Sequence, residues 1–400
     1  MRIHPVIPAA ALVLLLGGCA APVSDLPDDD PHAESELDAP QPRLAVLHDG
    51  GILVLDATTL DEVADVPTDG VTRLAEAGDG RHVLLTTADG FAVLDGGAWT
   101  DRHGDHGHSY AAPPELTDLE FPMDHPGHVV PHHGTTALFS DGAGTVTFVD
   151  ADDLDEDAPA TRVLELASAH HGVALQLSDG VVLVTAGDEE SRRSVLALAA
   201  DGTELARTDA CPDVHGETVA ANEAVLFGCT GVVVVHEAGG FRTIALPDAE
   251  GNVSGPAGSD ASPVVLADYL APGEDLSSRV ALVDLAADAV RLVELPAEYY
   301  YWSLARDDDG DGVVLATDGS LHVVDVISGA LTASLPVIDA WTPPEDWRDP
   351  APSVTVLDGI AYVTDPAGHA VHAVDLATGD SIGTADLGDT VPHSLALIRG

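Results

Sequence analysis

A repeat of about 40–45 residues is the feature that most constrains the fold of this 400-residue chain. Its clearest copy lies near the C-terminus, where four short apolar segments each end in a turn rich in Gly and Asp. These segments are residues 352–359, 360–368, 370–379 and 381–387. Segments like the third recur at residues 52–55, 91–94, 145–149, 194–198, 232–236, 280–288 and 321–329. Four short strands per unit at this period are typical of β-propeller blades.

The two ends of the repeat region complement each other. The first unit, which begins at Arg43, lacks an innermost strand, whereas residues 393–400 form a spare one. Pairing the two would close the ring and remove exposed strand edges. We therefore predict an all-β fold, a single β-propeller over residues 43–400, eight-bladed and closed by its N- and C-terminal strands. Seven blades are the alternative, because the sixth unit has a weak first strand around residues 259–263.

The N-terminal residues predict export. Arg2 precedes an apolar run over residues 9–16 that leads into Leu-Gly-Gly-Cys19, the pattern of a lipoprotein signal. The run is too short to span a bilayer comfortably, so we expect residues 1–18 to be a cleaved signal peptide and Cys19 to be lipidated. Residues 19–42 are acidic and rich in Pro, which predicts a flexible tether. The expected location is extracytoplasmic, in the periplasm or on the outer face, anchored to the membrane by lipid.

Cysteine count and charge narrow the function classes. Cys211 and Cys229 form an even pair, and in an oxidising compartment such a pair predicts a disulfide, with a two-cysteine metal site as the alternative. The net charge is −53, and all 15 basic residues are arginine. A surface this acidic repels nucleic acid, which excludes a nucleic-acid-binding function. Solubility, a coding bias against lysine and salt adaptation account for the net charge, so the charge does not by itself indicate a cation-binding site. We expect the protein to be a monomer.

One insertion is dense in histidine. His103, His106 and His108 crowd into residues 100–118, between the third and fourth strands of the second unit. Imidazole is the commonest protein ligand of borderline transition metals, so this loop predicts a zinc site suited to capture and release. Asp105 is a candidate oxygen ligand or orienting group. The alternative is a solvated surface loop.

A second set of histidines precedes the apolar runs that begin units. These are His128, His170, His171 and His215. Because the first strand of each blade lines the central channel, we expect these side chains to converge there as a second zinc site. His132, His133 and Glu217 are candidate additional ligands. Hydrogen-bonded strand residues are the alternative interpretation.

The histidine motifs resemble those of the AztD family of periplasmic zinc metallochaperones. The matching segments are residues 99–110 (WTDRHGDHGHSY), 127–134 (GHVVPHHG), 170–174 (HHGVA), 211–217 (CPDVHGE) and 227–229 (FGC). The resemblance covers essentially residues 43–400 and implies a propeller that binds Zn²⁺ and transfers it to the solute-binding protein of a zinc ABC importer. The chain departs from the family where His133 replaces an expected acidic residue and where its lipidation signal implies a tethered protein.

The predicted function is therefore an extracytoplasmic zinc metallochaperone with Zn²⁺ as its cargo. Two other classes stay open: a propeller that only scaffolds another protein, and a metal-dependent hydrolase with His215 and Glu217 at its centre. We expect no enzyme, since the sequence has no Gly-x-Ser-x-Gly, His-Glu-x-x-His or phosphate-binding glycine motif. Zinc ligation by neutral imidazoles predicts release on acidification, near the ordinary histidine pKa of about 6.5.

Overall fold

The computed structural model describes residues 34–400 except 105 and 189. Within these residues the chain forms β-strands and two short 3₁₀ turns, η1 (Ala151–Asp153) and η2 (Ala221–Glu223). The predicted all-β class is confirmed. The predicted signal peptide, the lipidated Cys19 and the candidate ligand Asp105 lie outside the described residues. No helix in the described part of the chain is long and apolar enough to cross a membrane.

Most strands belong to antiparallel sheets of four. In spatial order, the first sheet is β34 (Leu395–Ile398), β2 (Arg43–His48), β3 (Gly51–Asp56) and β4 (Glu62–Pro67). The second is β5 (Arg73–Glu76), β6 (His82–Thr86), β7 (Gly90–Asp95) and β10 (Glu115–Pro122). The third is β11 (Pro126–His132), β12 (Thr135–Ser140), β13 (Thr145–Asp150) and β14 (Thr161–Glu165). The fourth is β15 (Ala174–Gln176), β16 (Val182–Gly187), β17 (Arg192–Leu198) and β18 (Glu204–Thr208).

The remaining sheets follow the same antiparallel plan. The fifth is β19 (Glu217–Ala220), β20 (Ala224–Gly228), β21 (Val232–Glu237) and β22 (Gly240–Ala245). A seven-stranded sheet contains β23 (Pro256–Ala257), β24 (Val264–Asp268), β25 (Ser277–Asp284), β26 (Ala289–Arg306), β27 (Gly312–Ala316), β28 (Ser320–Asp325) and β29 (Ala330–Pro336). The last four-stranded sheet is β30 (Val354–Leu357), β31 (Ile360–Asp365), β32 (Ala370–Asp375) and β33 (Ser381–Asp386).

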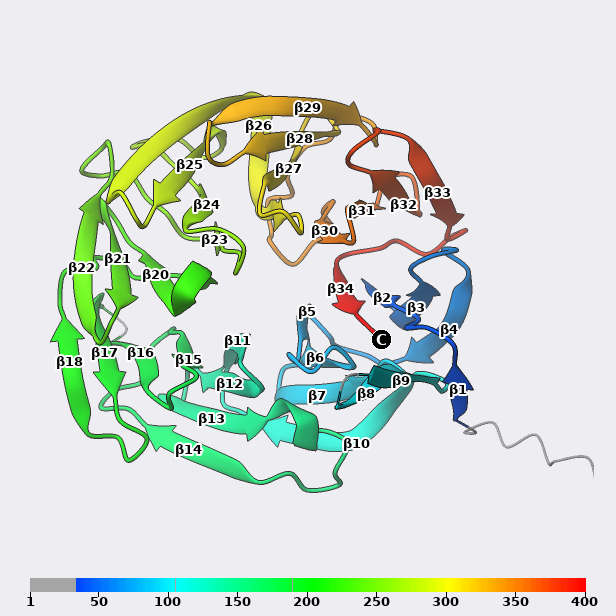
Figure 1. The fold of residues 1–400 in the computed structure, drawn as a ribbon, viewed down its shortest axis with the longest axis horizontal. Helices are drawn as coiled ribbons and strands as arrows, with labels where there is room; N and C mark the ends of the chain where they lie inside the picture. The colour runs from blue at the N-terminus through cyan, green and yellow to red at the C-terminus, as the bar shows by residue number, and fades with distance from the viewer. Residues whose placement is uncertain (1–33, 105, 189) are drawn as a thin grey trace, which may run out of the picture. The chain divides into compact units, whose positions relative to one another are not determined.

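The sheets follow one another around a central axis, with β11, β15 and β34 near it and β4, β14 and β18 at the rim (Figure 1). Neighbouring sheets pack through apolar faces because alternate strand residues point to opposite sides. Leu44 shares a buried cluster with Val371 of β32, whereas the adjacent Ala45 shares one with Val83 of β6. The first sheet is therefore enclosed by the last and the second.

The C-terminal strand is part of the first sheet. β34 runs antiparallel to β2, with Leu397 opposite Leu44 and Leu395 opposite Val46. The His393 N–H donates to the Leu47 carbonyl at 2.8 Å and extends this pairing. Both ends of the repeat region thus contribute to one sheet.

A β-hairpin stands apart from the four-stranded sheets. It consists of β8 (Ala98–His103) and β9 (His106–Ala111), and β1 (Ser35–Leu37) pairs with β9 to make a three-stranded sheet. β1 lies within residues 19–42, the segment predicted as a tether. The chain that follows the predicted export signal therefore contacts the histidine-rich insertion directly.

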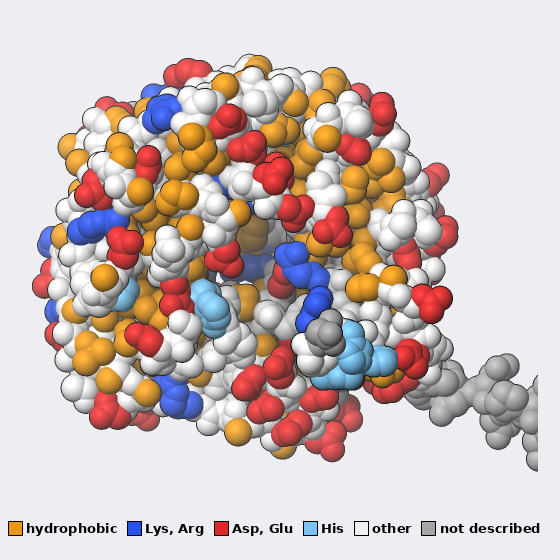
Figure 2. Space-filling view, viewed as in Figure 1, with side chains coloured by type: hydrophobic (Ala, Val, Ile, Leu, Met, Phe, Trp, Pro, Cys, Tyr) orange, Lys and Arg blue, Asp and Glu red, His pale blue; other side chains and the backbone are white. Residues whose placement is uncertain are grey.

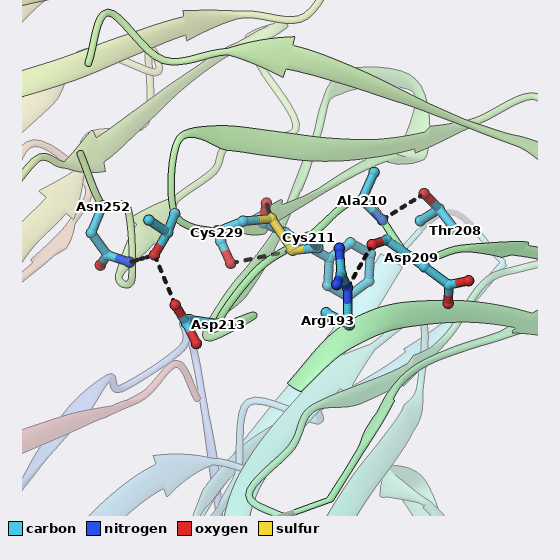
Figure 3. Close-up of a disulfide and its surroundings, with 11 residues drawn as sticks. Arg193, Thr208, Asp209, Ala210, Cys211, Asp213, Cys229 and Asn252 are labelled. Atoms are coloured by element: carbon cyan, nitrogen blue, oxygen red, sulfur yellow. Dashed lines mark hydrogen bonds between the residues drawn. A yellow bond between two sulfur atoms is a disulfide. The ribbon is translucent and has the colours of Figure 1, made fainter. Parts of the chain in front are cut away.

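The disulfide predicted between Cys211 and Cys229 is confirmed, with the two Cα atoms 5.1 Å apart and both residues fully buried. It joins the segment after β18 to the residue that follows β20 (Figure 3). A backbone hydrogen bond ties the same segments together, because the His215 N–H donates to the Gly228 carbonyl at 3.0 Å. The disulfide thus fixes the segment that carries His215.

Candidate metal sites

Three groups of side chains in the described residues place potential metal ligands within 4.8 Å of one another. The channel cluster is His128, His171 and His215; the hairpin cluster is His103, His106 and His108; the turn cluster is His132, His133 and Glu223. Three of the four histidines predicted to converge in the channel therefore do meet, and so do all three of the insertion.

The channel cluster draws one imidazole from each of three sheets. His128 lies on β11, His171 precedes β15 and His215 precedes β19. The Nε2 atoms of His128 and His171 are 3.2 Å apart, and the three ring centroids are 4.9, 5.2 and 5.4 Å apart. Two ligand atoms on a tetrahedral Zn²⁺ with Zn–N bonds of about 2.0–2.1 Å are separated by roughly 3.3 Å. The His128–His171 spacing matches that value.

Glycines allow the backbone close approaches that this cluster needs. Gly216 has φ +67°, and a Cβ there would collide with the Ser254 carbonyl oxygen. Gly127 lies against the Asp141 carboxylate, and a Cβ there would collide with it. Gly127 adjoins His128 and Gly216 adjoins His215, so steric crowding explains why each of these histidines has a glycine as its neighbour.

Hydrogen bonds orient two of the three rings. His171 Nδ1 lies 2.6 Å from Asp141 Oδ2, and His215 Nδ1 donates to the Ser254 carbonyl at 3.1 Å. An acceptor at Nδ1 fixes the tautomer whose Nε2 carries a lone pair, the arrangement found behind most metal-ligating histidines. Asp141 and Ser254 therefore act as orienting groups. No sequence motif singles them out.

Burial favours the neutral form of two of the three rings. It lowers the pKa of His128 well below its ordinary value, and the neighbouring His171 and His215 lower it further. Burial also lowers the pKa of His215. Since neutral imidazole is the form that binds metal, His128 and His215 are ready to ligate at neutral pH.

The cluster opens into a cavity of about 510 Å³. Glu217, Trp302 and Trp347 line it together with the three imidazoles. Burial raises the pKa of Glu217 to about 7, and Glu217 Oε2 has no hydrogen-bond partner among the described residues. A cation in this cavity would favour the ionised carboxylate. Glu217 can therefore become negatively charged when a cation binds. It does not belong to the channel cluster, whose three ligand atoms lie within 4.8 Å of one another.

His170 points elsewhere, although it was predicted to converge with its neighbour. It is 3% exposed, its Nδ1 donates to the Ser168 carbonyl at 3.0 Å, and its ring lies edge-on to Phe139. His170 and His171 lie in the irregular segment before β15, where His170 turns into the interior and His171 toward His128. His170 therefore packs in the protein interior and does not belong to the channel cluster.

The hairpin cluster follows from strand register. His103 and His106 are directly opposite across β8 and β9, and His108 lies two residues further along the same face. The ring centroids are 4.4, 5.1 and 5.2 Å apart, and His103 and His106 are exposed. His108 Nδ1 lies 2.8 Å from Glu36 Oε1 on β1. Glu36 was not predicted as part of this site, because its position depends on β1 pairing with β9.

The turn cluster combines the end of β11 with η2. His132 Nε2 lies 2.8 Å and His133 Nε2 3.9 Å from Glu223 Oε1. The sequence suggested both histidines as candidate ligands but not Glu223, which lies 90 residues further on in a turn without a local motif.

Comparisons with known proteins agree with this description. No family model matches the chain. The zinc chaperone AztD of Citrobacter koseri is 28% identical over 338 residues, which are 80% of this chain and 77% of that protein. A crystal structure of C. koseri AztD has a TM-score of 0.79 at 22% identity and covers 90% of this chain and 99% of that one. The structure of apo AztD from the same organism has a TM-score of 0.77 at 21% identity, covering 90% and 98%. The resemblance to AztD indicated by the histidine motifs is thereby confirmed.

Proposed function

We propose that this protein is an extracytoplasmic zinc chaperone that binds Zn²⁺ at the channel cluster and passes it to another protein. The observation that carries the proposal is the convergence of His128, His171 and His215 from three separate sheets on one cavity. Two of these half-buried rings have lowered pKa values, and two are oriented through Nδ1. A packing role does not require three imidazoles to face one another.

The coordination suits a cargo rather than a permanent structural metal. Three imidazoles leave a fourth tetrahedral position, and the cavity gives an incoming ligand access to it. A partner can then replace the protein ligands one at a time, without an intermediate of low coordination. Glu217 supplies a fourth ligand or a compensating charge until transfer. The similarity to a zinc chaperone supports this assignment over hydrolysis or scaffolding.

The hairpin cluster is proposed as a second zinc site or exchange arm. His103 and His106 are exposed on an insertion outside the four-stranded sheets, where a partner can reach them. We propose as recipient the solute-binding protein of a zinc ABC importer, as the family resemblance implies. Lipid attachment at Cys19 would hold a monomeric chaperone at the membrane beside that importer.

For the fold, we propose a closed eight-bladed propeller. Six sheets have four strands in blade order, and the seven-stranded sheet equals two blades that share β26. The β2–β34 pairing supports closure of the ring by the two ends of the chain.

A transfer assay tests the function. Zinc-loaded protein is mixed with the apo solute-binding protein encoded beside a zinc importer, the two are separated by size, and zinc is measured in each. Transfer faster than the release of zinc to a chelator of equal affinity is expected. Equal rates would show passive release and contradict chaperoning.

A further inference from the structure

We infer that the turn cluster, His132, His133 and Glu223, is a separate binding site for a zinc-class divalent cation. This inference goes beyond the proposed function and does not rest on it. His132 ends β11, and His128 of the channel cluster lies four residues earlier on the same strand. At about 3.3 Å per residue, that separation is roughly 13 Å. The two clusters cannot share one ion.

The backbone is strained where it presents these ligands. His133 has φ +45° and Glu223 φ +59°, and Asn222 beside Glu223 has φ +62°. Left-handed conformations are uncommon for residues other than glycine, and each costs of order 1–3 kcal/mol unless its surroundings enforce it. Two segments that are distant in sequence therefore use unfavourable backbone to bring His133 and Glu223 to the same point.

The carboxylate is held in place by groups that do not ligate. Glu223 Oε1 accepts from the Ser178 backbone N–H at 2.6 Å, and Oε2 accepts from the Ser178 hydroxyl at 2.7 Å. Hydrogen bonds of this kind orient metal-binding carboxylates. These bonds and the one from His132 lower the pKa of Glu223, although partial burial opposes them. The oxygen is therefore ionised and aimed at both imidazoles.

The donor set fits a borderline metal. Two nitrogens and one carboxylate oxygen, with a position left for water, match the pattern of exchangeable zinc sites. The imidazole planes are 89° apart and their centroids 4.5 Å apart, so the rings approach one point from different directions. The His132 side chain is 10% exposed and that of His133 61%, which gives the site one fixed and one accessible arm.

Metal binding at the turn cluster would change the tautomer of His132. Its Nε2–H donates to Glu223 Oε1 at 2.8 Å. A metal at Nε2 replaces that N–H bond with a metal–nitrogen bond and adds a metal–oxygen bond to Glu223, while the ring takes up a proton at Nδ1 and stays neutral. The hydrogen bond between the two side chains is thereby exchanged for a shared metal ion.

The position of the site suits contact with other molecules. Figure 2 shows a group of histidine side chains over the β8–β9 hairpin. His133 of the turn cluster is exposed, as are His103 and His106 of the hairpin cluster, so another molecule can reach both clusters.

A zinc titration of the full chain against a chromophoric competitor tests the inference. His133→Ala and Glu223→Gln are each expected to lose one equivalent of zinc. His369→Ala is the matched control, since the half-buried His369 also has a positive φ, +50°, but belongs to none of the three clusters found among the described residues. It should retain every equivalent.

Unchanged stoichiometry and affinity in both variants would overturn the inference. His171→Ala separates it from the proposed function, since that change should remove a different equivalent and leave the one assigned to the turn cluster. If either variant fails to fold, Ser178→Ala keeps all three ligands and removes only the hydroxyl donor to Glu223. It should weaken this equivalent about 10-fold, and an unchanged affinity would equally contradict the site.

Discussion

His171 Nδ1 lies 2.6 Å from Asp141 Oδ2, and this contact turns the Nε2 atom of the ring toward His128, 3.2 Å away. Asp141 follows β12, so an acidic residue in one sheet orients a histidine that precedes the next. The channel cluster thus depends on the packing of neighbouring sheets.

Replacing Asp141 by Asn should weaken zinc binding at the channel cluster. The amide keeps the shape but loses the charge that stabilises the ligating ring, and changes of this kind cost about 10–100-fold in metal affinity. Asp124→Asn is the matched control, because Asp124 makes the same contact to His125 at an exposed position. Competitive zinc titration measures both. Similar affinities for the two variants would contradict an orienting role for Asp141.

Replacing His170 by Asn should reduce stability without removing a zinc equivalent. His170 is buried and bonded to the Ser168 carbonyl, so we expect a loss of about 1–3 kcal/mol in the free energy of unfolding. Denaturant unfolding and zinc stoichiometry are measured on the same preparation. Loss of one equivalent with unchanged stability would instead identify His170 as a ligand.

Changing His103, His106 and His108 together to Ala should remove the hairpin equivalent and leave the fold intact. The cluster makes little contact with the buried core, so the free energy of unfolding without metal should change by less than about 1 kcal/mol. Transfer to the recipient should slow if the hairpin is the exchange arm. A transfer rate equal to that of the wild-type protein would show that the hairpin cluster binds zinc but takes no part in its transfer.

Removing the disulfide should affect both stability and metal binding. Replacing Cys211 and Cys229 by Ser is expected to cost about 2–5 kcal/mol. Because the disulfide fixes the segment that carries His215, zinc affinity at the channel should also fall. Unfolding and zinc titrations of the two proteins provide the comparison. A variant with lower stability but unchanged affinity would show that hydrogen bonds alone position His215.

Acid should destabilise the metal-free protein through His236, which belongs to no metal cluster. Burial lowers the pKa of this ring, which is 3% exposed. As the pH falls below about 6.5, the unfolded chain takes up a proton that the folded chain refuses, so stability is lost with falling pH. His236→Phe should reduce the loss between pH 6.5 and 5.5 by at most about 1 kcal/mol. Urea unfolding at both pH values would reveal equal losses if the ring titrates normally.

The sequence predicted those parts of the site that depend on periodicity. Short strands with Gly and Asp turns indicated the all-β fold, and the position of histidines at strand starts placed His128, His171 and His215 together. The different orientations of His170 and His171 were not predictable in this way, because both lie in the irregular segment before β15. The hairpin cluster was equally predictable from the sequence, because its three histidines are close together in the chain.

The missed groups come from turns whose positions depend on sheet packing. Asp141, Glu223 and Ser254 have no motif, and only the assembled sheets bring them to the histidines. We also did not predict β26 as a single strand. It has 18 residues, continues through Pro296 and joins two repeat units. The Tyr299 hydroxyl, which donates to the Arg279 carbonyl at 2.8 Å, helps to hold this long strand against β25.

The most direct test of the central claim is a competitive zinc titration of the wild-type chain beside a variant with His128, His171 and His215 changed to Ala, with circular dichroism to verify folding. We expect the wild-type protein to bind zinc tightly and the folded variant to lose the tightest equivalent. A folded variant that retains this equivalent would contradict zinc binding at the channel cluster and with it the proposed function.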